Sequence, residues 1–244
     1  MKKSFVSFFT AFAAVLTVQT LKADVIADWT FQTSASTNNI ISTGKTPSAT
    51  QSGISADIGA GTASASHATA GTAWSIPSGN GSSNSWSANN WNQNDYYQFQ
   101  VSTIGFDTIT ISYDQTGSAT GPKTFALQYS IDGSSFTTFG SSYSLISTPA
   151  WNPNTPSGSA GESFAFDLSS ITVINGISAA YFRVIDLSPT TAGAINGGNV
   201  GTAGTDRIDN FIVNGVLVPV PEPSTLAFAT FGGIACLLAL RRKR

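Results

Sequence analysis

The stretch TFALQYSIDGSSFTTF, residues 124–139, constrains the fold of this chain more than any other segment. Apolar and polar residues alternate on both sides of Asp132-Gly133, and this period of two is typical of half-buried strands. An Asp-Gly dipeptide suits a tight turn between two such strands, because both residues tolerate positive φ. The segment therefore predicts an antiparallel β-hairpin.

Shorter runs of the same kind recur between stretches rich in Gly, Ser, Thr and Asn. They cover residues 25–31, 95–101, 107–113, 163–168, 180–186 and 207–215. Between residues 44 and 92 large aliphatic side chains are scarce, which predicts long loops with one or two short strands. Residues 171–179 fit either a strand or a short helical turn. Roughly eight antiparallel strands with one buried face predict an all-β, two-sheet jelly-roll sandwich.

The N-terminal segment combines a basic head, Lys2 and Lys3, with an apolar body over residues 5–18 and a small residue, Ala23. This order is typical of a secretory signal peptide, and the body is shorter than the roughly 20 residues of a spanning helix. We therefore expect a signal helix over residues 1–23, exported by the Sec machinery and cleaved after Ala23. An uncleaved anchor is the alternative.

The C-terminal segment places an uninterrupted apolar run of 15 residues, 226–240, between two other features. Pro221, Glu222 and Pro223 precede the run, and the cations Arg241, Arg242, Lys243 and Arg244 follow it. As a helix the run covers roughly 22 Å of a hydrocarbon core about 30 Å thick. The terminal cations snorkel to the headgroups and stay on the cytoplasmic side. We expect a single transmembrane helix here; a buried core helix is the alternative.

These three features, in this order, resemble the PEP-CTERM sorting signal of Gram-negative surface and secreted proteins. The resemblance covers residues 218–244 and implies that a membrane-embedded cysteine protease, exosortase, recognises the tail and cuts beside Pro-Glu-Pro. It also implies a brief stay in the inner membrane, followed by transfer to the cell surface or the extracellular space. The expected organisation is a signal peptide (1–23), a sandwich domain (24–217) and a sorting tail (218–244).

The part of the chain expected to be exported, residues 24–221, is acidic. It carries twelve acidic and four basic side chains, a net charge of −8, because seven of the eleven cations lie in the two end segments. Such a domain repels phosphate backbones, so nucleic acid is a poor partner. The single cysteine, Cys236, lies in the apolar tail. Without a disulfide, the stability of the domain must come from core packing, helped by metal if one binds.

Residues 121–139 and 204–215 resemble jelly-roll domains of exported bacterial proteins with this tail, and also carbohydrate-binding sandwich modules. The second resemblance implies a structural calcium ion held by the terminal strands, with Asp209 and Asp28 as ligands. Carboxylate and carbonyl oxygens are the ligands that calcium prefers. Alternatively, these carboxylates bond to loop amides or pair with Arg207 or Arg183.

An aromatic segment, residues 74–99, sets several tryptophans among Asn, Ser and Gly. A Trp face stacks on the apolar face of a sugar ring, while Asn and Asp bind hydroxyl groups. This pattern predicts glycan contact at Trp86 or Trp91. The competing interpretation is that these rings fill the core, where a large aromatic side chain buries much area.

Catalytic motifs are weak in this sequence. His67, the sole histidine, lies in a flexible polar stretch where we expect a surface side chain, and no GxSxG motif accompanies it. Zinc would need a cluster of His and Cys that the chain lacks. Most Asp residues adjoin Gly, Ser or Asn, where Asp serves turns.

The sequence therefore favours a non-enzymatic, structural or adhesive surface protein. Exopolysaccharide is the partner implied by the kind of organism that uses this tail. A secreted glycoside hydrolase or lyase is the first alternative, since two of the many carboxylates would suffice for such a reaction. A structural surface protein without a ligand is the second.

Overall fold

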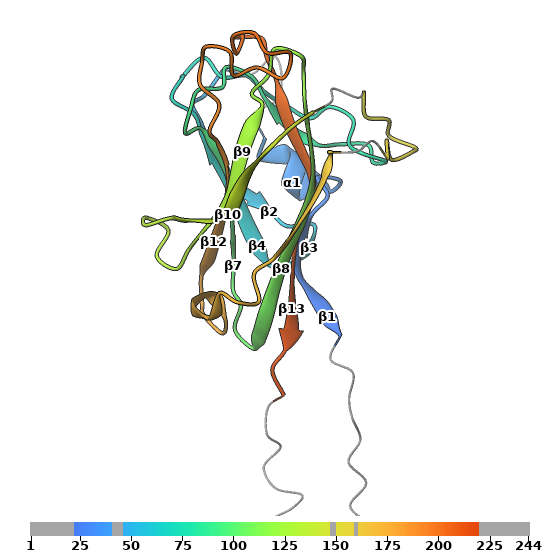
Figure 1. Cartoon of the computed structure of the whole chain (residues 1–244). Helices are drawn as coiled ribbons and strands as arrows, with labels where there is room; N and C mark the ends of the chain where they lie inside the picture. Colours follow the sequence, from blue (N-terminus) through green and yellow to red (C-terminus); the bar gives the residue numbers. More distant parts are fainter. Residues whose placement is uncertain (1–21, 41–45, 147–149, 159–160, 220–244) are drawn as a thin grey trace, which may run out of the picture.

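The computed structural model describes residues 22–40, 46–146, 150–158 and 161–219 (Figure 1). The expected transmembrane helix lies outside the described residues, as does the expected signal helix except for residues 22 and 23, of which Ala23 begins a strand. Pro221, Glu222, Pro223 and the four terminal cations lie outside the described residues as well. Within the described ranges, no helix has the length and apolar character needed to cross a membrane.

The regular secondary structure of the described chain consists almost entirely of strands in two antiparallel sheets. Sheet A contains β1 (Ala23–Trp29), β3 (Ile58–Gly59), β5 (Trp74–Ser75), β6 (Trp86–Ala88), β8 (Phe106–Gly117), β11 (Ser163–Asp167) and β13 (Asp206–Leu217). Sheet B contains β2 (Thr50–Ser55), β4 (Gly61–Ser66), β7 (Tyr96–Val101), β9 (Thr124–Ser130), β10 (Thr137–Ser144) and β12 (Ala180–Asp186). The all-β, two-sheet prediction is confirmed.

Strands that are distant in sequence lie side by side in both sheets. In sheet A the order is β11-β8-β13-β1-β3, with β6 also paired to β13 and β5 to β6; in sheet B it is β10-β9-β12-β7-β4-β2. The last strand, β13, therefore lies at the centre of sheet A, between the first strand, β1, and β8. This arrangement brings the two ends of the described chain to the same end of the sandwich (Figure 1).

The predicted hairpin is present as β9 and β10, with Thr137 opposite Tyr129. Its connection is longer than a two-residue turn and spans residues 131–136. The Asp132 carboxylate accepts hydrogen bonds from the Ser134 and Ser135 N–H groups, each at 2.8 Å, and Gly133 adopts φ +72°. Side-chain bonds of this kind stabilise a wider Asp turn.

Between residues 44 and 92 the expectation of only one or two short strands is wrong, because β2, β3, β4, β5 and β6 all fall there. These strands use small residues: Ala63 and Ala65 of β4 are buried. The Trp29 ring of sheet A packs directly over Gly61, where any side chain would collide with it. Small residues on one sheet thus make room for large rings on the other.

Two short helical pieces complete the described chain, α1 (Ser34–Asn38) and the 3₁₀ turn η1 (Thr172–Ile174). The second answers the question left open for residues 171–179 in favour of a helical turn. The core between the sheets is aromatic: the Phe99 and Phe211 rings stack with centroids 3.5 Å apart, and Trp29 meets Phe99 edge-on at 5.0 Å.

Candidate functional site

Trp86 and Trp91 lie in the core of the sandwich. Trp86 is 0% exposed and Trp91 3% exposed. The Trp86 ring centroid lies 4.9 Å from that of Tyr97 and 5.6 Å from that of Trp74, while Trp91 lies 5.1 Å from Tyr97. Neither ring offers a face to a sugar in this fold. The geometry matches the alternative in which both tryptophans fill the core.

His67 is also buried, so the expected surface position is wrong. Its ring lies between Trp74 and Trp91, with centroids 4.7 Å and 4.3 Å away. Burial lowers the pKa of His67 to about 3, so the imidazole is neutral at ordinary pH. Large neighbouring rings, rather than the local Ser- and Ala-rich sequence, decide its burial.

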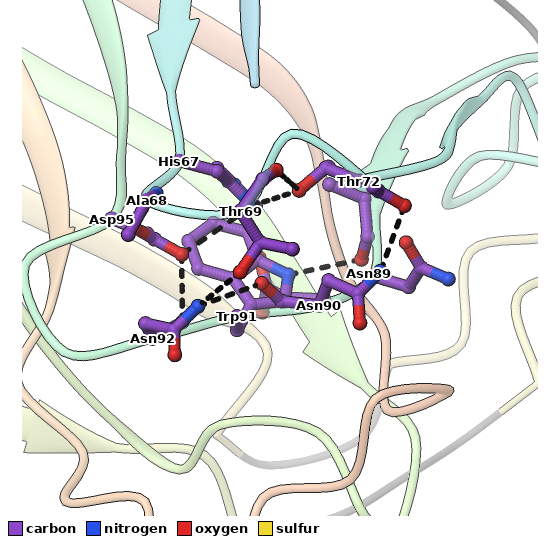
Figure 2. Close-up of polar contacts among 12 residues, drawn as sticks. His67, Ala68, Thr69, Thr72, Asn89, Asn90, Trp91, Asn92 and Asp95 are labelled. Carbon is purple, nitrogen blue, oxygen red and sulfur yellow. Dashed lines mark hydrogen bonds and ion pairs between the residues drawn. The ribbon is translucent and has the colours of Figure 1, made fainter. Parts of the chain in front are cut away.

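Polar contacts around His67 join residues 67–73 with residues 89–95, as Figure 2 shows. His67 Nδ1 lies 3.5 Å from Asp95 Oδ2 and 3.3 Å from the Thr72 hydroxyl. Asp95 in turn accepts from the N–H groups of Ala68 at 2.7 Å and Asn92 at 2.6 Å. Because these partners connect residues 67–72 with residues 91–95, we assign the cluster a structural role.

Asp209 is fully buried beneath the loop over residues 78–84. Its Oδ2 accepts hydrogen bonds from the Asn80 N–H at 2.9 Å and the Ser82 hydroxyl at 2.8 Å, and Oδ1 accepts from the Asn210 N–H at 2.9 Å. Burial raises the pKa of Asp209 to about 7 despite these donors. These contacts match the alternative interpretation of the sequence, in which the Asp209 carboxylate accepts hydrogen bonds from loop amides instead of binding calcium.

Asp28 and Asp209 have different neighbours in the sheet. Asp28 lies opposite Ile212 on the β1–β13 ladder, and burial together with the nearby Asp57 charge raises the pKa of Asp28 to about 6. No group of three or more His, Cys, Asp or Glu side chains within the described residues is arranged to hold a metal ion. The structure therefore does not bring Asp28 and Asp209 together as a calcium site.

A shallow groove runs along the outer face of sheet A, over β11, β8 and β13. On β8, Ile111 and Tyr113 point into the core, so Thr110, Ser112 and Asp114 alternate to the outer face. One hollow of about 310 Å³ is lined by Ser112, Tyr113, Asp114, Ser163, Phe164, Ala165, Asn210 and Ile212. A second, of about 250 Å³, is lined by Thr110, Ile111, Ser112, Ala165, Phe166 and Asp167. They share Ser112 and Ala165, so together they form one groove.

Asp114 organises the polar side of this groove. Its two oxygens accept hydrogen bonds from the Ser163 hydroxyl at 2.5 Å and from the Asn210 amide at 2.9 Å. Asn210 sits in a β-bulge between Asp209 and Ile212 and adopts φ +51°, a conformation that Asn tolerates better than most residues. The bulge turns the Asn210 side chain toward Asp114. No sequence motif marked this groove, because its residues come from three separate strands.

Comparison with known proteins gives one sequence match and several distant structural ones. No curated protein sequence matches the chain. A carbohydrate-binding module solved in a study of mannan recognition is 11% identical, with 80% of this chain and 98% of that chain covered and a TM-score of 0.39. The K3 cleaved adhesin domain of Lys-gingipain from Porphyromonas gingivalis is 14% identical, with 60% and 80% covered and a TM-score of 0.32. A carbohydrate-binding module in complex with β-1,4-galactotriose is 14% identical, with 54% and 70% covered and a TM-score of 0.27.

The sequence match lies at the C-terminus, where residues 219–244 fit the PEP-CTERM protein-sorting motif. This confirms the resemblance seen in the tail. The protein thus consists of a sandwich body of two antiparallel β-sheets that carries a PEP-CTERM sorting motif at its C-terminus.

Proposed function

We propose that this is an exported, non-enzymatic protein of the cell surface or extracellular matrix, whose jelly-roll-like body binds exopolysaccharide in the groove of sheet A. In this proposal the Sec machinery exports the chain, the tail holds it briefly in the inner membrane, and an exosortase-type protease cuts beside Pro221-Glu222-Pro223. The sorting motif at residues 219–244 carries the part of the proposal that concerns export.

The chemistry of the groove supports a hydroxyl-rich ligand. Asp114 and Ser163 offer acceptors, and Asn210 offers both a donor and an acceptor, at one wall. Ile212 and Ala165 add apolar surface for the C–H faces of a sugar ring. The groove is open and follows the strands, a shape suited to a linear polymer.

The negative charge of the groove and of the exported part of the chain limits which polysaccharides can bind. Asp114 and Asp167 both line the groove, and the exported part of the chain carries a net charge of −8. A uronic or sulfated polymer would be repelled by these carboxylates. We therefore propose a neutral or amino-sugar-containing polysaccharide as the ligand.

The spacing of the groove carboxylates argues against glycoside hydrolysis. Asp114 lies opposite Ser163 and Asp167 lies opposite Thr110, so the two are four residues apart along the β8–β11 ladder. That separation is roughly 13 Å along a strand, whereas glycosidases hold their carboxyl groups about 5–9.5 Å apart. Asp209 is nearer to Asp114, but it is fully buried and its oxygens are taken by loop donors.

Filling the groove is expected to abolish polysaccharide retention without unfolding the protein. Ala165 is exposed in the floor of the groove, so Ala165→Trp should block the ligand and weaken retention at least about tenfold, as measured by affinity electrophoresis in the organism's own exopolysaccharide. Thr138→Trp, at an exposed position of β10 in the other sheet, is the matched control.

Three results bear on the alternatives. If the Ala165→Trp and Thr138→Trp variants were retained equally, the groove would not be the polysaccharide-binding site. Release of reducing sugar ends that stops in Asp114→Asn would instead favour the hydrolase alternative. No retention by the wild-type protein on any polysaccharide tested would favour a structural protein without a ligand.

Processing of the tail is tested by the mass of the native protein. The mature C-terminus is expected near residues 221–224, in a fraction outside the inner membrane. Replacing Pro221, Glu222 and Pro223 with alanine should leave a full-length chain in the membrane fraction, because the protease loses its recognition segment. Pro219→Ala, which changes a proline outside the Pro221-Glu222-Pro223 segment, should be processed normally. A full-length wild-type chain that stays in the membrane would show that the tail is a plain anchor.

A further inference from the structure

Both ends of the described chain leave the sandwich at the same end, as Figure 1 shows. Several exposed apolar side chains belong to the segments at this end. The set, which we call the apolar collar, comprises Val25, Ile104, Val173, Leu217 and Val218, with exposed fractions of 45%, 63%, 56%, 50% and 44%. Singly exposed apolar residues are common on protein surfaces, but a group at one place marks an interaction surface.

Backbone pairing places the collar residues of the two terminal strands together with the β7–β8 loop. The Val218 N–H donates to the Gly105 carbonyl at 2.9 Å, next to Ile104, and Leu217 lies opposite Phe106. Val25, near the start of β1, lies opposite Asn214, near the end of β13. Three chain segments therefore contribute apolar side chains to this end.

The 3₁₀ turn η1 joins the same end through two hydrogen bonds. The Thr103 hydroxyl donates to the Ile174 carbonyl at 2.7 Å, and the Gly176 N–H donates to the Phe106 carbonyl at 3.1 Å. These bonds hold Val173, which is exposed on the turn, near Ile104. The collar thus surrounds the point where β13 ends and the chain continues toward the sorting tail.

Chain length limits how far this end can lie from a membrane that holds the tail. Seven residues, 219–225, separate Val218 from the apolar run that begins at Leu226. Fully extended, such a segment reaches about 25 Å at most. Any bilayer that holds residues 226–240 is therefore the nearest large apolar partner of the collar.

We propose that, before the tail is cut, the apolar collar rests on the outer surface of the inner membrane and inserts its side chains among the lipid headgroups. This inference depends on the proposed anchoring by the tail. Seated in this way, the sandwich holds the Pro-Glu-Pro segment at a fixed height above the bilayer, where a membrane-embedded protease reaches it. Asp24 and Asp107 flank the collar on β1 and β8, so the contact is apolar rather than an attraction to anionic lipids.

Lipid quenching of a fluorophore on the full-length chain tests the proposal. Cys236→Ala removes the native thiol, and Ile104→Cys or Ile131→Cys then carries a polarity-sensitive label. Ile131 is 55% exposed, close to the value for Ile104, but it lies in the β9–β10 connection outside the collar. In vesicles of phosphatidylethanolamine and phosphatidylglycerol with headgroup-quencher lipid, quenching at 104 should exceed that at 131 at least about threefold. Val173→Glu should reduce the difference.

Flotation of the same vesicles separates the two ways in which the experiment can fail. If the chain floats with the vesicles but both labels are quenched equally, the collar does not touch lipid, and the anchoring by the tail still stands. If the chain does not float, the proposed anchoring itself fails and the inference falls with it. A blue shift at 104 without lipid quenching would mean that a second copy or the chain's own tail covers the collar, and would also overturn the proposal.

Discussion

Replacing Trp86 with alanine is expected to lower the free energy of unfolding by about 3–5 kcal/mol, because it removes a fully buried ring from a close-packed core. Trp86 lies at the meeting point of the two sheets. Its ring contacts Trp74 of sheet A, Phe31 in the segment that follows β1, and Tyr97 of sheet B. Chemical denaturation of the mature protein measures the loss.

Conservative variants separate ring size from hydrogen bonding. Among the described residues, Trp86 Nε1 has no hydrogen-bond partner, whereas Trp91 Nε1 donates to the Ala88 carbonyl at 2.9 Å. Trp86→Phe should therefore cost less than Trp91→Phe, by about 1 kcal/mol for the lost bond. If Trp86→Ala kept the wild-type stability yet lost polysaccharide retention, the ring would be a surface contact and the core assignment would be wrong.

The fold class was predictable because the longest strands carry their own pattern. In β8 and β13, residues alternate between the core and the outer face, and the sequence shows the same alternation. The segment around β2 and β4 was not predictable in this way. Its buried positions hold the small residues Ala63 and Ala65, and Gly61 on the same strand leaves room for the ring of Trp29, a residue of the opposite sheet. Packing between segments that are far apart in the sequence leaves no recognisable pattern in either segment alone.

The candidate site was less predictable than the fold. Ser112 and Asp114 look like the ordinary solvent face of a strand, and only the pairing of β8 with β11 and β13 turns them into a groove. The aromatic residues led to the prediction of glycan contact at Trp86 or Trp91. Only the burial of a Trp ring shows whether it fills the core or can meet a ligand, and burial cannot be read from the local sequence. His67 shows the same limit, because its neighbours rather than its local sequence determine its pKa.

The second large effect is a fall in stability as the pH rises from about 4 to about 8. Burial raises the pKa of Asp186 and of Asp209 to about 7, and holds the pKa of Asp206 well above its usual range. Burial and the Asp57 charge raise the pKa of Asp28 to about 6. Between the ordinary Asp value of 3.8 and these values, the folded protein binds more protons than the unfolded chain. Its stability therefore decreases as the pH rises through that window.

Asp206 lies at the end of a buried chain of hydrogen bonds. The Tyr113 hydroxyl lies 2.7 Å from that of Tyr143, which donates to Gln115 Oε1 at 2.6 Å. The Gln115 amide then donates to both Asp206 oxygens at 3.1 Å. The Gln115 donors favour the charged form of Asp206, but burial, together with the nearby Asp186 charge, raises its pKa more than these donors lower it.

The lowered pKa of His67 works against the fall in stability with rising pH but does not reverse it. Its folded pKa of about 3 lies below the ordinary value of 6.5, so its contribution to stability is present at neutral pH and is lost on acidification toward pH 3. One imidazole acts against four carboxyl groups between about pH 4 and pH 6, so the sum still falls with rising pH. Below about pH 4 the stability falls on further acidification, because the histidine contribution is lost together with those of Asp57, Asp132 and Asp167, whose pKa values are lowered. The stability maximum therefore lies near pH 4.

Asp186→Asn provides the sharpest test of this pH dependence. The Asp186 Oδ1 accepts from the Ser188 N–H at 2.7 Å, and an amide oxygen can keep that bond. Removing the ionisable group should raise stability at pH 8 by on the order of 4 kcal/mol, the equivalent of a shift from 3.8 to about 7, and leave pH 4 nearly unchanged. Asp132→Asn, at an exposed turn, should not change the slope between pH 4 and pH 8, because the pKa of Asp132 is lowered rather than raised. A melting temperature that rises from pH 4 to pH 8 in the wild type would show that these buried carboxyl groups are compensated when ionised, as by a bound cation.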